Sequence, residues 1–153
     1  MKRPLMFIAA GVLAATASSP SWAEKTQALN IIEIPAPPAG QAQVVWFRRG
    51  GAGFIVGCSV NENGAKISSL GAGRYFVMQT TPGTHVFTVA SEATDTLVLD
   101  LQANVTTYAE CKIKMGILIG RPKIELSNEA SFRSKSKSLK LVDADDQVSV
   151  QPK

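Results

Sequence analysis

The chain has 153 residues, of which 45% are hydrophobic and 18% are charged, and its formal net charge is +4. That length suffices for one domain with a single hydrophobic core and is short for two ordinary domains. Two cysteines, one histidine and the absence of a Cys-x-x-Cys pair argue against zinc-finger and thiol-redox chemistry.

The first 23 residues have the features of a cleaved secretory signal peptide. Lys2 and Arg3 precede an apolar stretch over residues 5–17, and small residues up to Ala23 match the positions that a signal peptidase reads. We therefore expect cleavage after Ala23 and a periplasmic mature protein. No cysteine follows the apolar stretch to carry a lipid, and no later segment is long enough to span a bilayer. Removing Lys2 and Arg3 leaves 14 of the 16 basic residues against 12 acidic ones, so nucleic acid is not expected as a partner.

The mature chain begins with a proline-rich segment over residues 24–39. Pro35, Pro37 and Pro38 cannot donate to a central hydrogen-bond ladder, so we predict a lead-in or an edge strand here. The folded domain should then cover residues 40–142. The polar, acidic residues 143–153 are expected to form a flexible tail.

Residues 41–49 predict a strand at the centre of the domain. Val44 and Trp46 fall on one face and Val45 and Phe47 on the other, so both faces are apolar, as a strand covered on both sides requires. Trp46 is expected in the core, although an exposed Trp would also suit sugar stacking.

Short alternating segments follow over residues 54–89, separated by turn residues that include Asn63-Gly64, Gly71-Ala72-Gly73 and Pro82-Gly83. Asn and Gly tolerate the positive φ that tight hairpins need, so this run predicts a β-meander. In particular, we expect residues 74–80 and 85–90 to pair across Pro82-Gly83, with Gly83 at positive φ in a type II turn.

Both cysteines are predicted to face inward. Cys58 alternates in phase with Phe54, Val56 and Val60, while Cys111 shares a strand face with Ala109, Ile113 and Met115. The opposite face of that second strand carries Tyr108, Glu110, Lys112 and Lys114. In an exported protein this pattern favours a Cys58–Cys111 disulfide, and the alternative is two buried free thiols.

Further strands are predicted over residues 97–101 and 123–126, and residues 127–140 suit either a short helix or a polar edge strand. Strands at this spacing, without crossover helices between them, indicate an all-β fold. We predict an antiparallel β-sandwich of seven or eight strands, immunoglobulin-like or transthyretin-like, with the short helix at its C-terminal end.

The C-terminal part of the domain is basic. Eight basic and two acidic residues lie between positions 112 and 140, and the segment could dock on an anionic surface. The alternative is a solvated face whose lysines discourage edge pairing. The apolar run from Gly116 to Gly120 is either a contact for a partner or membrane, or a buried strand continuation or covered bend. The candidate binding residues are Lys112, Lys114, Arg121, Lys123, Arg133, Lys135, Lys137 and Lys140.

Catalytic chemistry has little support in the sequence. A hydrolase would need His85 as its general base, with a serine such as Ser59 or Ser69 and an acid such as Asp95, and no local motif supports this set. His85 stands at a strand start on the face of Phe87, so we expect it to bond a turn carbonyl instead. No catalytic residue, metal ligand or cofactor is predicted.

Several short motifs occur in an order that resembles a known family. They are Pro38-Ala39-Gly40, Val44-Val45-Trp46-Phe47-Arg48, Val60-Asn61, Asn63-Gly64, Gly73-Arg74-Tyr75 and Pro82-Gly83-Thr84-His85. Over residues 36–129 the chain resembles a bacterial family of exported proteins and lipoproteins that is described only as a domain of unknown function. Its turn pattern is also similar to PEGA repeats and to carboxypeptidase-regulatory-like sandwiches. The resemblance implies a small β-sandwich of the cell envelope and assigns no activity.

The sequence therefore predicts a non-enzymatic periplasmic protein that binds or interacts with an envelope protein or an anionic envelope surface. Two alternatives stay open: a small hydrolase that uses His85, and a protein that binds anionic lipid or lipopolysaccharide through its basic C-terminal region.

Overall fold

The structure is a computed structural model that describes residues 31–51, 55–90, 93–115 and 120–143. The predicted signal peptide, the apolar run over 116–119 and nearly all of the predicted tail lie outside these residues. The strands are β1 (Ala42–Arg48), β2 (Cys58–Glu62), β3 (Ala65–Leu70), β4 (Arg74–Thr80), β5 (Gly83–Ala90), β6 (Thr94–Leu101), β7 (Thr106–Lys114), β8 (Arg121–Ser127) and β9 (Lys140–Leu141). A short helix α1 (Glu129–Arg133) and a 3-10 helix η1 (Ser136–Ser138) precede β9.

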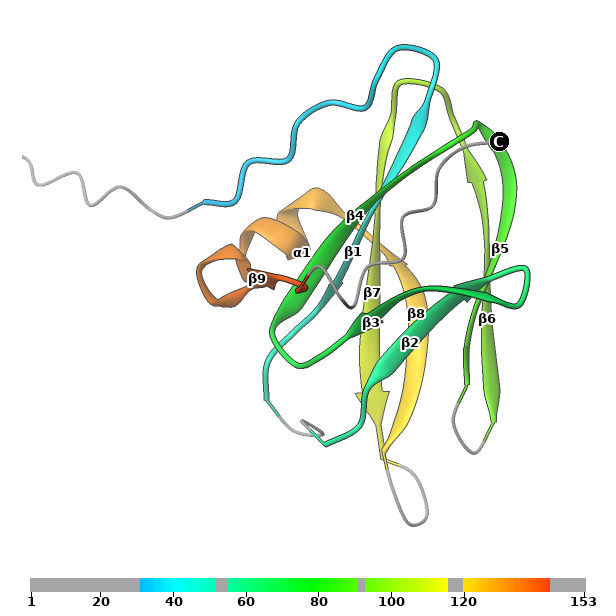
Figure 1. The fold of residues 1–153 in the computed structure, drawn as a ribbon. Helices are drawn as coiled ribbons and strands as arrows, with labels where there is room; N and C mark the ends of the chain where they lie inside the picture. The colour runs from blue at the N-terminus through cyan, green and yellow to red at the C-terminus, as the bar shows by residue number, and fades with distance from the viewer. Residues whose placement is uncertain (1–30, 52–54, 91–92, 116–119, 144–153) are drawn as a thin grey trace, which may run out of the picture.

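The strands form two sheets packed face to face, with orders β8-β7-β1-β4-β9 and β3-β2-β5-β6 (Figure 1). This confirms the all-β sandwich, with nine strands in the described residues instead of seven or eight. The sheets are not wholly antiparallel, because β1 runs parallel to β7 and β4 runs parallel to β9. The finer choice between an immunoglobulin-like and a transthyretin-like sandwich stays a prediction.

The predicted central strand is confirmed in β1, where all seven residues are buried and both neighbours are strands of the same sheet. Val44 and Trp46 face the second sheet. Trp46 is fully buried and packs edge-on against Phe87, with ring centroids 5.0 Å apart. Trp46 is therefore a core residue and offers no exposed platform for sugar stacking.

The run over residues 54–89 is not a continuous meander. Its first hairpin is confirmed, because β2 and β3 join through Asn63 and Gly64, both at positive φ (49° and 82°). After β3, however, the chain crosses to the other sheet, where β4 pairs with β1. It then returns across Pro82-Gly83, and β5 pairs with β2 and β6.

The predicted pairing of residues 74–80 with 85–90 is thus wrong. Gly83 does take a positive φ, of 128°, but it connects two layers instead of closing a hairpin. Period-2 alternation looks the same for a strand that turns back beside its predecessor and for one that crosses the core, so the sequence pattern could not separate the two.

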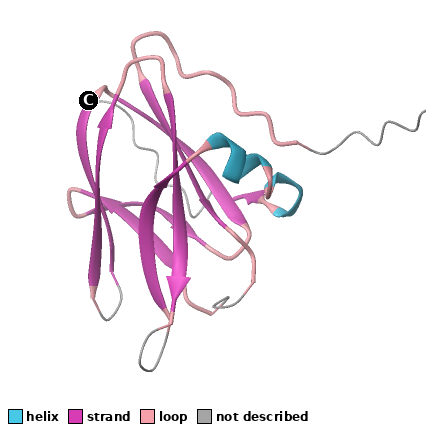
Figure 2. Cartoon of the chain, turned by 180° about the vertical axis from the view of Figure 1, so that it is seen from behind, coloured by secondary structure: helices cyan, strands magenta, loops and turns pink. Residues whose placement is uncertain are grey.

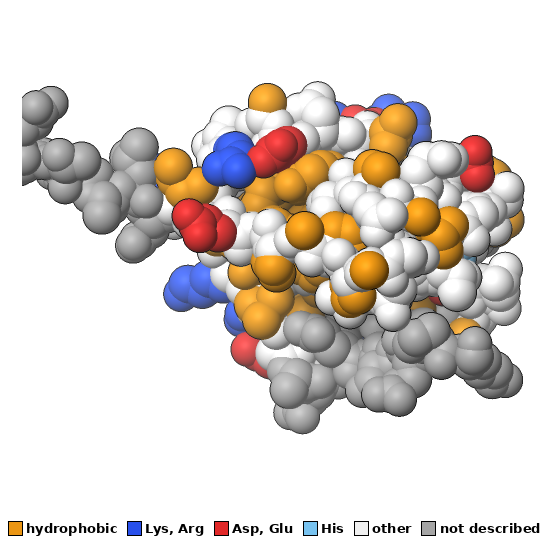
Figure 3. All heavy atoms as spheres, turned by 90° about the horizontal axis from the view of Figure 1, so that it is seen from above, with side chains coloured by type: hydrophobic (Ala, Val, Ile, Leu, Met, Phe, Trp, Pro, Cys, Tyr) orange, Lys and Arg blue, Asp and Glu red, His pale blue; other side chains and the backbone are white. Residues whose placement is uncertain are grey.

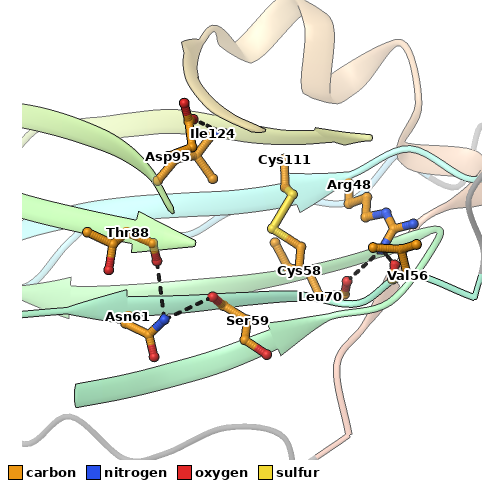
Figure 4. The surroundings of a disulfide bond; sticks show 10 residues. All are labelled: Arg48, Val56, Cys58, Ser59, Asn61, Leu70, Thr88, Asp95, Cys111 and Ile124. Carbon is orange, nitrogen blue, oxygen red and sulfur yellow. Dashed lines mark hydrogen bonds between the residues drawn. A yellow bond between two sulfur atoms is a disulfide. The ribbon is translucent and has the colours of Figure 1, made fainter. Parts of the chain in front are cut away.

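Cys58 and Cys111 form a disulfide between the two sheets, with 6.7 Å between their Cα atoms (Figure 4). Both cysteines face the core as predicted. The strand that carries Cys58 begins at that residue, later than the predicted residue 54, and Val56 lies outside it. A bridge across 53 positions stabilises the fold by about 4 kcal/mol on the chain-entropy model.

A second, smaller hydrophobic cluster lies on part of the outer face of the five-stranded sheet. Figure 2 shows the helix that packs there beside the sheet. Phe132 of α1 and Leu139 pack there on Val45 and Phe47. Asn128 caps α1 by accepting a hydrogen bond from the Ser131 amide at 2.9 Å. Residues 127–140 thus contain the predicted short helix, which lets a polar segment bury two apolar side chains.

The proline-rich lead-in also reaches this outer cluster. Ile32 and Ile34 pack against it, although residues 31–38 form no strand, so the edge-strand alternative is wrong for this part of the segment. Gln43 fixes the lead-in by donating from Nε2 to the Pro35 carbonyl at 2.9 Å.

Candidate functional site

The outer face of β7 and β8 places like charges directly opposite one another. Lys112 faces Lys123, and Lys114 faces Arg121. These four residues, called the cation ladder below, point away from the core because their strand neighbours Cys111 and Ile124 are buried between the sheets. Like charges directly opposite in an antiparallel pair destabilise it, so this arrangement opposes folding.

Two acidic residues lie directly beside the ladder. The next cross-strand pair is Glu110 with Glu125, and Lys112 lies between them, in an ion pair with Glu125 and 3.8 Å from Glu110. Arg49 Nε lies 2.6 Å from Glu110 Oε1, which balances a carboxylate that is only 2% exposed.

The Lys112 ammonium lowers the pKa of Glu125 below its ordinary value, first by a hydrogen bond to the carboxylate and then by its charge. The charges of Lys123 and Lys114 act in the same direction. This carboxylate thus stays ionised to lower pH than a free one. It forms an ion pair with Lys112.

A hollow of about 290 Å³ lies at the loop end of the ladder, between β6 and the ends of β7 and β8. In Figure 1 this is the lower end of the sandwich, where β7 stops and both β6 and β8 begin. The described residues that line it are Ala93, Thr94, Asp95, Lys114, Met115, Arg121, Pro122 and Lys123. Three of the four ladder cations therefore reach one concave surface.

Two residues of this region depart from the sequence expectations. Met115 was expected to face the core, but it follows the last residue of β7 and is 97% exposed at the hollow. Asp95 was a candidate acid for a hydrolase. Its Oδ2 instead accepts the backbone N–H of Ile124 at 2.8 Å, so it joins the edge of β8 to β6 (Figure 4).

The opposite end of the sandwich has a different surface. Seen from above in Figure 3, it presents hydrophobic side chains at its centre and charged side chains at its margin.

The structure divides the predicted basic region into two groups. The other four cations, Arg133, Lys135, Lys137 and Lys140, lie in and around α1, η1 and β9. Arg133 Nη2 lies 2.6 Å from Glu129 on the same helix. Lys140 is paired in register with Arg74 of β4, so β1 and β4 separate β9 from β7. This second group is spread along a segment that covers the sheet and does not extend the ladder.

The geometry around His85 is that of a structural residue, as expected. Its Nε2 donates to the Thr81 carbonyl at 2.8 Å, its Nδ1 contacts the Glu62 carboxylate, and its ring stacks on Phe87 at 6.1 Å. Ser59 and Ser69 are cross-strand neighbours on the outer face of their sheet, whereas His85 shares the inner face with Phe87. The structure does not bring the hydrolase set together.

Sequence reasoning missed the burial of Arg48. This side chain is 2% exposed and donates to the carbonyls of Val56 and Leu70, the latter at 3.1 Å, beside the disulfide (Figure 4). Burial lowers the pKa of Arg48 from its ordinary value. The only sign of this burial in the sequence was that a charged residue directly follows the apolar run of β1. These contacts tie β1 to Val56 and to the last residue of β3.

No protein-family model, curated protein or solved structure matches the chain. Within the described residues, no group of three or more His, Cys, Asp or Glu side chains could hold a metal ion. Over the same residues, no helix has the length and hydrophobicity needed to cross a membrane.

Proposed function

We propose that this protein is a non-enzymatic binding protein of the cell envelope that holds an anionic partner on the cation ladder. The observation that carries the proposal is the pair of successive like-charge contacts, Lys112 with Lys123 and Lys114 with Arg121. A placement that opposes folding is expected where the charges serve binding, since natural proteins depart from local rules mainly at functional sites.

The alternative explanation, that these cations protect an edge strand from aggregation, accounts for less of the geometry. β8 is an edge strand, but Asp95 already occupies the Ile124 N–H on that edge. The ladder cations point from the face of the sheet, and two of them lie on β7, which is paired on both sides. A face carrying one sign of charge attracts anionic surfaces and loses that attraction as salt rises.

Export is the second part of the proposal, and it rests on the sequence of residues 1–23. An anionic partner in the periplasm would be a phospholipid headgroup, lipopolysaccharide or an acidic envelope protein. The resemblance to an exported family of unknown function agrees with this compartment and stays a prediction.

Vesicle binding tests the proposal with a matched pair of variants. Wild type should sediment with phosphatidylglycerol vesicles at low salt and not with phosphatidylcholine vesicles. Lys114→Gln/Lys123→Gln should weaken binding by roughly 30-fold, since each cation near an anionic surface contributes about 1 kcal/mol. Lys135→Gln/Lys137→Gln removes the same charge from the second basic group and should bind like wild type.

Two results would overturn the proposal. Binding that does not change between low and high salt would exclude an electrostatic contact. Equal losses in the two double variants would show that only net charge matters and that the ladder has no special role.

A further inference from the structure

We infer that the outer edge of β6 is a self-association surface, on which a second copy of this chain pairs its own β6 in antiparallel register. An edge strand offers a row of backbone donors and acceptors that a further strand can use. This dimer does not depend on the proposed function, because it involves the four-stranded sheet, whereas the cation ladder lies on the other sheet.

Three of the four sheet edges in the described residues are short, irregular or already engaged. The edge strand β9 has only two residues. The register of β3 with β2 shifts between Val60 and Asn61, and such a bulge disrupts the ladder at an edge. On β8, Pro122 has no N–H and the Ile124 N–H is bound by Asp95. None of these edges presents a long, regular row of backbone groups.

The fourth edge, β6, has a different character. All eight residues from Thr94 to Leu101 pair with β5 in unbroken register, and the two strands lie side by side at one margin of the sandwich (Figure 1). No strand among the described residues lies beyond β6. The strand contains no lysine, arginine or proline, the residues that most often protect an edge. Its one inward carboxylate, Asp95, is bound to the backbone of β8.

The middle of β6 also exposes apolar surface on the outer face of its sheet. Val98 is 58% exposed, and its cross-strand neighbour Val86 on β5 is 37% exposed. The next residue, Leu99, faces the core and is 6% exposed. A β-branched side chain on a sheet face is stabilised mainly by its cross-strand neighbours. Among the described strands, Val98 has such a neighbour on one side only.

The side chains favour a second copy as the occupant, because β6 is complementary to itself. A two-fold axis at Val98 sets Val98 opposite Val98 of the second copy and Thr96 opposite Asp100 of the second copy. The Thr96 hydroxyl can donate to that carboxylate, which has acceptor sites beyond the one that Gln102 of its own chain binds at 3.2 Å. An axis at Asp100 would instead set two carboxylates face to face, which is unfavourable.

The size of the contact determines how tightly the copies associate. A single pair of strands falls at the low end of interface sizes, below the roughly 1,200 Å² of total buried surface that stable complexes have. We therefore expect a reversible dimer that forms as the protein concentration rises, and not an obligate one.

Pairing about this axis has a consequence for the cation ladder. A two-fold axis between antiparallel strands stands perpendicular to their sheet, so both five-stranded sheets would pack on the same face of the joined eight-stranded sheet. Both ladders would then face the same way and contact one anionic surface together. This consequence rests on the proposed function, whereas the dimer does not.

Sedimentation equilibrium over a range of protein concentrations tests the dimer and its register. Wild type should show a monomer–dimer equilibrium without any ligand. Thr96→Lys sets an ammonium group opposite Asp100 of the second copy at two symmetric positions and should tighten the dimer about fivefold. Thr94→Lys makes the same change two positions earlier on the same face, where it stands diagonally to that carboxylate, and should tighten the dimer less than about twofold.

A neutral pair of variants tests the apolar contact. Val98→Thr keeps the charge and the branched shape but replaces one methyl group in each copy, and should weaken the dimer about fivefold. Val86→Thr makes the same change one strand away from the joint and should weaken it less than about twofold. Urea unfolding of both variants checks that each is folded at the concentrations used.

The same neutral pair tests the shared contact of the two ladders. Val98→Thr should bind phosphatidylglycerol vesicles more weakly than Val86→Thr, because two linked ladders bind one surface more tightly than a single ladder does. Equal vesicle binding by the two variants would overturn the shared contact and leave the dimer standing.

Several results would overturn the dimer or its register. A protein that stays monomeric up to millimolar concentration would show that the β6 edge takes a different strand or none. Tighter association of Thr94→Lys than of Thr96→Lys would move the axis away from Val98, and a dimer indifferent to Val98→Thr would place the contact elsewhere. A protein that dimerises but binds no anionic vesicle would contradict the proposed function alone.

Discussion

The cation ladder and the capping segment, defined as residues 128–142, each contain four of the eight predicted binding cations, yet they present them differently. In the ladder, register places the cations against one another on two paired strands. In the capping segment the cations surround Phe132 and Leu139, which pack on the sheet, and Arg133 is paired with Glu129 on its own helix. The two regions thus carry the same number of cations. In the ladder these cations lie side by side on one surface, and in the capping segment they surround a hydrophobic contact.

The test with the largest expected effect removes the disulfide, which joins the ladder strand β7 to the other sheet. Cys58→Ala/Cys111→Ala should lower the free energy of unfolding by about 4 kcal/mol, because the unfolded chain regains the freedom of a loop spanning 53 positions. Vesicle binding by the folded protein should persist, since seven residue pairs hold β7 against β8. Equilibrium urea unfolding and binding below the transition would measure both, and loss of binding in the folded state would show that the ladder depends on the bridge.

The second test removes the aromatic side chain at the centre of the capping segment. Phe132 is 1% exposed, and its ring lies 5.5 Å from that of Phe47 and 5.6 Å from those of Tyr75 and Tyr108. Phe132→Ala should cost about 3 kcal/mol, at the lower end for a buried Phe because a short peripheral helix can shift into part of the space. Vesicle binding should not change. A large loss of binding with little loss of stability would reverse the roles given to the two regions.

The third test reverses one charge in the ladder and measures both stability and binding. Lys114→Glu places a carboxylate opposite Arg121 and should raise the free energy of unfolding by about 0.5 kcal/mol while weakening vesicle binding. Lys137→Glu makes the same change at another exposed lysine in η1 and should give neither the gain nor the loss. A ladder variant that is less stable than wild type would contradict the view that these cations oppose folding.

The smallest expected effect concerns Glu125, which forms an ion pair with Lys112 of the ladder. Its pKa is lower in the folded protein than the ordinary value of 4.5, so its stabilising effect is present above that pH and is lost as the pH falls through the folded pKa. Glu125→Gln should flatten the fall in stability below pH 4.5, by at most about 1 kcal/mol because the pair is partly exposed. Urea unfolding between pH 3 and pH 7 checks this, and parallel pH profiles for both proteins would disprove the coupling to Lys112.

Local patterns allowed much of the fold to be predicted. The apolar faces of residues 41–49 place β1 at the centre, and Asn63-Gly64 closes a hairpin because both positions require positive φ. Alternation alone also indicated that Cys58 and Cys111 face the same core. These features depend on neighbours within a few residues, so the sequence displays them directly.

The predictions from the sequence were wrong or incomplete where the partner of a segment lies far along the chain. Pro82-Gly83 has the composition of a hairpin turn, but β4 and β5 find their partners in different sheets. Alternation likewise placed Glu110 on an outward face without indicating that Arg49 and Lys112 would surround it. Neither outcome is visible in a local pattern, because each depends on which strands become neighbours.

The sequence by itself determined an all-β domain with two inward cysteines and a basic C-terminal part, because strand periodicity and charge are properties of the chain. Only the tertiary structure decided which cations meet. Antiparallel pairing of β7 with β8 sets Lys112 against Lys123 and Lys114 against Arg121, whereas two intervening strands, β1 and β4, separate Lys140 from them. Coulomb interactions depend on distance in space, and it is the register of the sheet that fixes those distances.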